Sequence, residues 1–255
     1  MSTKDHQSEP IESASETLQR IFDGHGSVLG SQMADESSRY DVLKKTDFPK
    51  PQRTRRIAVA NQKGGVGKTT STVNTAAALA NKGAQVLVID MDPQGNASTA
   101  LGVSHASGEP SVYDVIEGRS DLGDVITVCP DFPTLDVVPA SIDLSGAELE
   151  VADLPNRNTL LKEALDLYLR QSDKHYDYVF IDCPPSLGLL VINAMCAVTE
   201  MLIPIQAEYY ALEGLGQLIN TIGLVQEHFN PVLLVSTMLV TMFDRRTLLS
   251  REVYN

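Results

Sequence analysis

Tryptophan is absent from the 255-residue chain, and cysteine and histidine are scarce. The three cysteines, Cys129, Cys183 and Cys196, form no CxxC pair and no even set, which excludes a disulfide scaffold and indicates a reducing compartment. The five histidines are scattered, and none stands at metal-ligand spacing from a cysteine or another histidine. A disulfide-rich secreted protein and a structural zinc protein are therefore excluded.

Long apolar runs are missing as well. The longest stretches without a charged residue, 183–199 and 228–243, are shorter than a membrane-spanning helix and contain proline. The first residues, Met-Ser-Thr-Lys-Asp-His, carry no apolar segment of the kind that a secretory signal needs. We therefore expect a cytoplasmic protein with no membrane among its partners.

Positive charge is in deficit. Lys and Arg number 20 against 33 Asp and Glu, so the formal net charge is −13. This balance argues against constitutive electrostatic binding to nucleic acid, which needs clustered Lys and Arg. The apolar share of 43% is that of a globular protein, and the length suffices for one or two domains with a buried core.

Residues 1–52 differ in composition from the remainder. They are rich in Ser, Asp, Glu and Gln, and we predict a mostly disordered acidic extension ahead of a folded domain at 53–255. Within the extension, apolar residues fall at helical spacing at Ile11, Ala14, Leu18, Ile21 and Phe22. This pattern fits either a transient helix without function or a docking peptide that folds on a partner.

From Arg56 onward, short apolar strand patterns alternate with helical patterns. The predicted strands are 56–60, 85–90, 135–138, 177–182, 201–205 and 232–240, and the main predicted helices are 69–82, 157–171, 188–198 and 211–229. Such alternation predicts an α/β fold, with a mostly parallel twisted sheet covered by helices on both faces. Right-handed crossovers then place the carboxyl ends of the strands, and with them the ligand site, along one edge.

The most informative motif connects the first of these strands to its helix. It reads Lys63, Gly64, Gly65, Val66, Gly67, Lys68, Thr69 and Thr70. Its glycines allow backbone amides to turn toward a phosphate, and the following helix points its positive end at the same place. We expect Lys68 to neutralise the β- and γ-phosphates and the Thr69 hydroxyl to bind Mg²⁺. An ordinary P-loop has glycine where this chain has Gln62, and a neutral residue where it has Lys63.

Carboxylates follow the ends of two other predicted strands. Asp90 and Asp92 point the same way on an extended segment, where either could hold the metal's water shell or orient an attacking water; a simple turn is the alternative. Asp182 ends the strand Tyr-Val-Phe-Ile-Asp, as in a Walker B element, and is expected to reach Mg²⁺. Its neighbour Cys183 is more typical of a small core residue than of a nucleophile.

Together these motifs resemble the deviant-Walker-A P-loop ATPases, and in particular the ParA/Soj branch of chromosome- and plasmid-partitioning proteins. The shared segments are 61–62, 92–96, 183–188, 208–214 and 242–247. The similarity runs from about Arg56 to the last residue and leaves the N-terminal extension outside it. Family members continue through a further strand, an adenine-contacting loop, more basic residues and a terminal helix, so we expect the chain to be C-terminally incomplete.

The resemblance implies roles for individual residues. Lys63 is similar to the signature lysine that reaches the partner's phosphates across a nucleotide-sandwich dimer, and Gly64 to the glycine where the two subunits approach. Asp92 is similar to the residue that positions the hydrolytic water. Arg246, with its neighbour Arg245, matches the segment needed for non-specific DNA binding by the ATP-bound dimer. The residues alone leave a solvated helix start open as the alternative for this segment.

The function implied by the resemblance is an ATP-dependent switch. ATP and Mg²⁺ assemble a homodimer, which doubles the basic patch and binds DNA without sequence preference. Slow hydrolysis, stimulated by a ParB-type centromere-binding partner, releases the DNA, and the protein would be nucleoid-associated in the cytoplasm. The alternatives are a membrane-cycling ATPase similar to MinD, a reductase similar to the nitrogenase iron protein, and a non-catalytic interaction module that binds through 11–22.

Overall fold

The computed structural model describes residues 28–46, 48–207 and 211–243. The helical spacing noted at 11–22 lies outside these ranges, and so do the arginines predicted to bind DNA, Arg245 and Arg246. The loop, strand ends and helices predicted to bind nucleotide all lie within them.

The chain divides into two compact units, Met1–Pro49 and Lys50–Asn255, three residues before the boundary expected between 52 and 53. In the first unit, helix α2 spans Val28–Lys45. Two lysines in its last turn interact favourably with the negative end of the helix dipole. The sequence predicted no helix here, because the apolar residues of this polar segment form no stripe at helical spacing.

The second unit is built on a seven-stranded sheet in the order β3-β4-β2-β5-β1-β6-β7. The strands are β1 (Arg55–Val59), β2 (Val86–Asp90), β3 (Thr127–Val128), β4 (Leu135–Val138), β5 (Tyr178–Asp182), β6 (Glu200–Gln206) and β7 (Leu234–Thr241). Neighbours pair in parallel except for β3 with β4. The mostly parallel α/β sheet expected from the sequence is confirmed.

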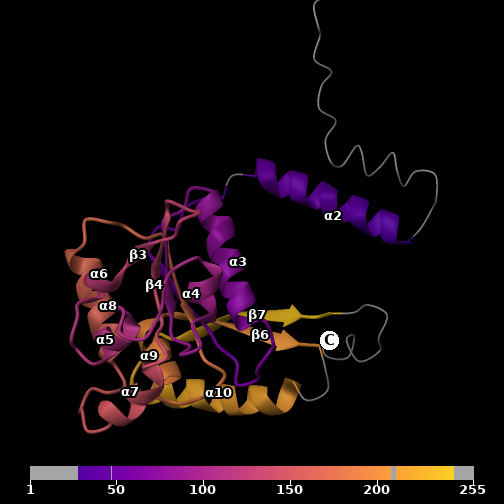
Figure 1. Ribbon diagram of the computed structural model, residues 1–255. Coiled ribbons are helices and arrows are strands. Elements are labelled where there is room, and N and C mark those ends of the chain that lie inside the picture. The colour runs from indigo at the N-terminus through magenta and orange to yellow at the C-terminus, as the bar shows by residue number, and fades with distance from the viewer. Residues whose placement is uncertain (1–27, 47, 208–210, 244–255) are drawn as a thin grey trace, which may run out of the picture. The chain divides into compact units, whose positions relative to one another are not determined.

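Helices cover both faces of this sheet (Figure 1). Alternate strand residues point to opposite faces, so Val88 and Phe180 pack in one apolar cluster and Ile89 and Ile181 in another. The first cluster is covered by α3 (Lys68–Asn81), and the second by α8 (Leu160–Gln171), α9 (Leu189–Ala197) and α10 (Ala211–His228). None of the helices in the described ranges is long and apolar enough to cross a membrane.

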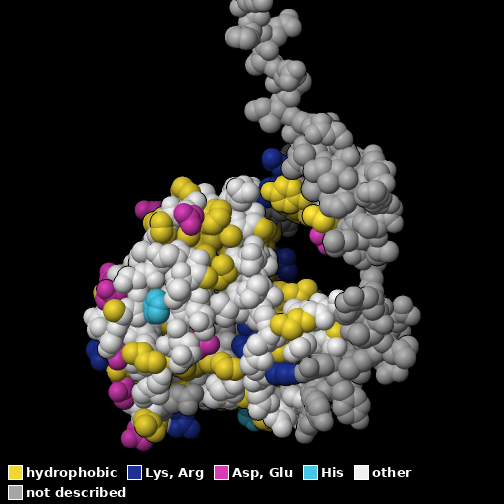
Figure 2. Space-filling view, turned by 45° about the vertical axis from the view of Figure 1, so that its right-hand side comes forward, with side chains coloured by type: hydrophobic (Ala, Val, Ile, Leu, Met, Phe, Trp, Pro, Cys, Tyr) yellow, Lys and Arg dark blue, Asp and Glu magenta, His cyan; other side chains and the backbone are white. Residues whose placement is uncertain are grey.

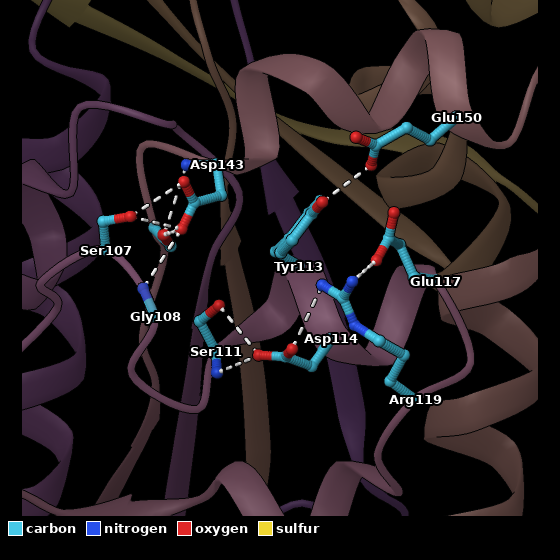
Figure 3. A network of polar contacts seen from close by, with 10 residues as sticks. Ser107, Gly108, Ser111, Tyr113, Asp114, Glu117, Arg119, Asp143 and Glu150 are labelled. Atoms are coloured by element: carbon cyan, nitrogen blue, oxygen red, sulfur yellow. Dashed lines mark hydrogen bonds and ion pairs between the residues drawn. The ribbon is translucent and has the colours of Figure 1, made fainter.

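Five short elements have no counterpart in the prediction. They are α4 (Asn96–Ala100), α5 (Val112–Ile116), α6 (Leu122–Val125), α7 (Leu144–Glu150) and the antiparallel strand β3. Helix α5 begins with a capping box, in which Ser111 and Asp114 exchange hydrogen bonds (Figure 3). These elements are stabilised by such local contacts and by tertiary packing, because they are too short to show a sequence period.

The surface of the second unit is unevenly charged. Exposed acidic residues on and beside α6 and α7 include Asp121, Asp124, Glu150 and Asp153. Figure 2 shows acidic side chains gathered mainly on the left of its view. The surface around α6 and α7 therefore carries a negative potential that disfavours contact with phosphate groups.

Candidate nucleotide-binding site

The site lies at the carboxyl ends of three adjacent strands, β2, β5 and β1. Asp182, the last residue of β5, lies beside Asp90 of β2 and Val59 of β1 in the parallel register. The segments that follow these strands therefore leave the sheet side by side, at the edge where open parallel sheets bind ligands. The P-loop (63–70) follows β1, and the segment we name the Asp92 turn (92–96) follows β2.

The P-loop reaches α3 through backbone conformations that glycine adopts most easily. Gly65 and Gly67 have φ angles of +74° and +90°, both in the left-handed region. Helix α3 begins at Lys68, directly after Gly67. The unpaired amides of its first turn and its positive end therefore point toward the loop, which favours a bound anion.

Lys68 is buried although its side chain carries an ammonium group, and only 7% of its surface is exposed. Its Nζ donates a hydrogen bond of 3.1 Å to the backbone oxygen of Lys63, so the side chain lies back along the loop. Burial lowers the pKa of Lys68, against the opposing effect of the Asp182 carboxylate. A phosphate at the loop would provide the negative partner that favours the charged form.

Asp182 is fully buried and accepts hydrogen bonds from two threonines of α3. Thr69 Oγ1 donates to its Oδ2 at 2.6 Å, and Thr72 Oγ1 donates to its Oδ1 at 3.0 Å. Burial raises the pKa of Asp182 to about 7. The structure thus brings together the two residues that the sequence assigned to Mg²⁺, and a hydroxyl beside a carboxylate is an oxygen donor set that fits this cation.

The two carboxylates after β2 have different surroundings. Asp90 is fully buried, and its Oδ2 accepts hydrogen bonds from the amide and the hydroxyl of Ser98 at 2.8 and 2.7 Å. Asp92 accepts a bond of 3.0 Å at Oδ1 from the amide of Gln94, within its own turn. Asp90 therefore anchors the start of α4, whereas the second oxygen of Asp92 has no hydrogen-bond donor among the described residues.

The other P-loop residues differ in exposure. Gly64 is exposed, and a Cβ added to it would meet no atom of the described residues within 4 Å. Thr70 is exposed too, and Lys63 is half-buried. Val66 is buried, and its backbone oxygen accepts a hydrogen bond of 2.9 Å from Thr241 Oγ1 at the end of β7. The outer side of the loop is thus open at Gly64 and braced at Val66.

Four residues to which the sequence assigned no role hold the site together: Asn61, Thr72, Ser98 and Thr241. The Asn61 side chain donates to the backbone oxygen of Pro204 on β6 at 2.7 Å and accepts from an amide of the P-loop at 3.0 Å. Their partners lie on other strands or in the P-loop, so only Thr72, one turn after Thr69 on α3, could have been suggested by spacing.

The cysteines take no part in this arrangement. All three are buried and free, and burial raises the pKa of the Cys183 thiol, which disfavours a nucleophilic role. In the described part of the chain, no group of three or more His, Cys, Asp or Glu residues could hold a metal ion. A metal bound by Thr69 and Asp182 therefore needs phosphate or water oxygens as its further ligands.

Comparison with known proteins identifies the family. Residues 54–235 match the family model described as an AAA domain. The chain is 50% identical over 197 residues to the sporulation initiation inhibitor protein Soj of Bacillus subtilis, an alignment that covers 77% of this chain and 76% of Soj. The chain belongs to the ParA/Soj family. The chromosome partitioning protein ParA of Caulobacter vibrioides is 46% identical over 197 residues, covering 77% of this chain and 73% of that protein.

Solved structures share the fold of this ParA/Soj family member. A Mycobacterium smegmatis protein named cobyrinic acid a,c-diamide synthase, with bound ADP and magnesium, has a TM-score of 0.72 at 40% identity and covers 79% of this chain and 80% of that one. A second structure of that name contains an ATP analogue and magnesium. A plasmid partition protein of Borrelia burgdorferi has a TM-score of 0.67 at 25% identity. Its alignment covers 80% of this chain and 84% of that one. ATP and Mg²⁺ are the ligands that the sequence of our chain predicts.

Proposed function

We propose that the chain is an ATP-dependent switch in DNA partitioning, in which MgATP drives assembly of a homodimer that binds DNA without sequence preference. Slow hydrolysis of ATP then releases the DNA. The observation that carries this proposal is the cluster of Lys68, Thr69 and Asp182, where a buried ammonium, a hydroxyl and a buried carboxylate lie at the phosphate-binding end of α3. The relatives named Soj and ParA provide the context of partitioning.

We assign the binding of MgATP to the P-loop together with Asp182. Lys68 and the amides of the first turn of α3 neutralise the phosphates. Thr69 and Asp182 hold Mg²⁺, which when bound withdraws charge from the phosphate oxygens. Asp182 faces a cation only after losing its proton, and burial raises its pKa to about 7. Mg²⁺-dependent binding is therefore expected to weaken as the pH falls below that value.

Asp92 is the residue that we assign to the hydrolytic water. The amide of Gln94 fixes one of its carboxylate oxygens, which sets the direction of the other. Positioning and charge stabilisation are then the only sources of catalysis, since a carboxylate of this kind is a weak base. Slow intrinsic turnover follows, and a ParB-type partner is assigned the role of accelerating it.

Dimer assembly is assigned to the outer side of the P-loop. A Cβ at Gly64 would meet no atom of the described residues within 4 Å, so we assign the effect of a side chain there to contact with a second subunit. We assign to Lys63, next to it, the contact with phosphates across the dimer. Because the surface at α6 and α7 is acidic, we assign DNA contact to Arg245 and Arg246. The switch would act in the cytoplasm, on the nucleoid.

Replacing Lys68 tests nucleotide binding directly. Lys68→Ala removes the ammonium that meets the phosphates, and we expect ATP affinity to fall by at least about 100-fold. Binding of a fluorescent ATP analogue measures the change. Lys82→Ala, at the opposite end of α3, is the matched control and should bind as the wild type does. An undiminished affinity of Lys68→Ala for the ATP analogue would refute the P-loop assignment.

Retention on DNA tests the switch itself. The purified chain should be retained with ATP, and neither with ADP nor without nucleotide. Asp92→Ala should stay on DNA because it does not turn over, whereas Arg246→Ala should bind ATP and lose DNA. Gly64→Val should bind ATP as a monomer and fail to retain DNA. Equal retention on DNA with ATP, with ADP and without nucleotide would contradict the proposal, and so would retention of Arg246→Ala.

A further inference from the structure

His105 lies against the Asp92 turn. A Cβ built on Gly95 would collide with its imidazole, meeting Cε1 at 2.6 Å and Cγ at 3.1 Å, so the ring packs on the bare backbone of this glycine. The ring Nε2 also shares a hydrogen bond of 2.8 Å with Oγ1 of Thr99 on α4. One side chain therefore contacts both the turn and the helix that follows it.

The backbone under this ring is the one that orients Asp92. The amide of Gly95 donates to the Asp92 backbone oxygen at 2.8 Å, and the neighbouring amide of Gln94 donates to the Asp92 carboxylate at 3.0 Å. Gly95 has a φ of +62°, a left-handed conformation that ends the turn and starts α4. A shift of Gly95 would therefore move the group that fixes the Asp92 side chain.

The loop that carries the histidine is itself anchored. Its two neighbours, Ser104 and Ala106, donate hydrogen bonds to Glu109 Oε2 at 2.6 and 3.1 Å. Further along, Ser107 Oγ donates to both carboxylate oxygens of Asp143 at 3.0 Å, as Figure 3 shows. The imidazole is thus presented to the turn by a fixed segment, and its contact with Gly95 is not that of a freely rotating surface side chain.

We propose that His105 is a positioning residue for ATP hydrolysis: its ring clamps the turn between Asp92 and α4 and so maintains the orientation of the Asp92 carboxylate. The ring does not act on the nucleotide. This inference rests on the role proposed above for Asp92. It predicts that His105 affects turnover while the affinity for ATP, which depends on the P-loop, is unchanged.

Three substitutions test the clamp. His105→Ala removes the ring, His105→Phe keeps a flat ring over Gly95 without the bond to Thr99, and His175→Ala is a matched control at an exposed histidine. We expect His105→Ala to lower kcat about tenfold and to leave the Kd for ATP within about twofold. His105→Phe should lie between the alanine variant and the wild type, and His175→Ala should match the wild type.

Hydrogen exchange reports on the turn without any reference to activity. In the nucleotide-free protein, the amides of Gln94 and Gly95 should exchange about tenfold faster in His105→Ala, because their acceptors lie within the turn that the ring covers. Unchanged exchange would overturn the inference. Faster exchange with unchanged kcat would also overturn it, and Asp92→Ala then shows whether the assignment of Asp92 fails as well, since that variant would still turn over.

A double substitution checks the contact itself. Gly95→Ala places a methyl group inside the volume of the imidazole, so it should lower kcat strongly in the wild-type background. In His105→Ala the space is empty, and the same change should cost several-fold less, with only the left-handed backbone to strain it. Additive effects of the two substitutions would show that the ring and Gly95 are uncoupled and would refute the clamp.

Discussion

Carboxylates at the amino ends of the strands, here called the strand-start edge, have different partners from those at the carboxyl ends, the strand-end edge. Where the strands begin, acidic residues have basic partners in four ion pairs: Lys50–Asp177, Arg55–Glu200, Arg56–Asp166 and Lys174–Asp136. Where the strands end, Asp90, Asp92 and Asp182 accept hydrogen bonds from hydroxyls and amides, and none of them has an ion pair with Lys or Arg among the described residues.

This difference separates the parts of the molecule that stabilise the fold from those that await a ligand. A buried carboxylate without a cation costs stability, and burial raises the pKa of both Asp90 and Asp182. The strand-start edge relieves that cost within the chain. The strand-end edge leaves it in place, so that a bound cation and phosphate group can relieve it instead.

The largest expected effect on stability comes from the strand-start edge. Lys174→Met would leave Asp136, which is buried on β4, with Tyr176 as its remaining partner, while its Oδ1 already lacks a hydrogen bond within the described residues. We expect the free energy of unfolding to fall by about 3 kcal/mol. Urea unfolding measures this, with Lys162→Met as the control, since it breaks a half-buried pair on α8 whose carboxylate keeps Arg56 as a partner. A loss of ATP affinity in Lys174→Met would break the separation of the two edges.

A gain in stability is expected at the strand-end edge. The pKa of Asp182 is raised from 3.8 to about 7 in the folded chain, so the folded state holds the extra proton between these values. Its contribution to the free energy of unfolding therefore falls as the pH rises from about 4 to about 7 and is level above. Asp182→Asn removes the buried charge and should stabilise the nucleotide-free protein by about 2 kcal/mol at pH 8 and by nothing at pH 4. Thermal unfolding at both pH values checks this, and a destabilised variant at pH 8 would refute the contrast.

The smallest effect is expected from Arg55–Glu200, an ion pair in which both side chains are partly exposed. Arg55 is 44% exposed, and its guanidinium contacts Glu200 at 2.6 Å. Because water and salt screen such a pair, Arg55→Ala should cost only about 0.5 kcal/mol. Unfolding at low and high salt would sharpen the comparison, since this loss should shrink more with salt than that of Lys174→Met, where the carboxylate is buried.

The sequence predicted the fold where an element is long and apolar. The strands that became β1, β2 and β5 contain continuous apolar runs, and the four longest helices of the second unit have at least nine residues, enough to show an apolar pattern. Helix α2 escaped prediction because its residues are mostly polar, and α4 to α7 because four to seven residues carry too little pattern. Their existence depends on caps and packing that only the folded chain provides.

In the candidate site, too, some residues could be predicted from local sequence and others could not. Lys68, Thr69 and Asp182 could be predicted because each lies in a motif or at a strand end that has a chemical meaning by itself. Thr241 could not, since its partner Val66 is 175 residues away in the chain. His105 could not, because its contact with Gly95 depends on how the loop after α4 folds back onto the turn. Supporting contacts of this kind leave no local signal in a single sequence.

The position of β1 in the sheet has a consequence for folding during synthesis. Its first residue, Arg55, pairs with Tyr178 of β5, and its other neighbour is β6, which comes later still. At about 5–20 residues per second, the roughly 120 residues in between take about 6 to 24 s to be synthesised, and β1 has neither of its strand partners in that time. The apolar segment Ile57–Val59 therefore lacks its strand partners during synthesis and is accessible to chaperones on the ribosome before the nucleotide site is assembled.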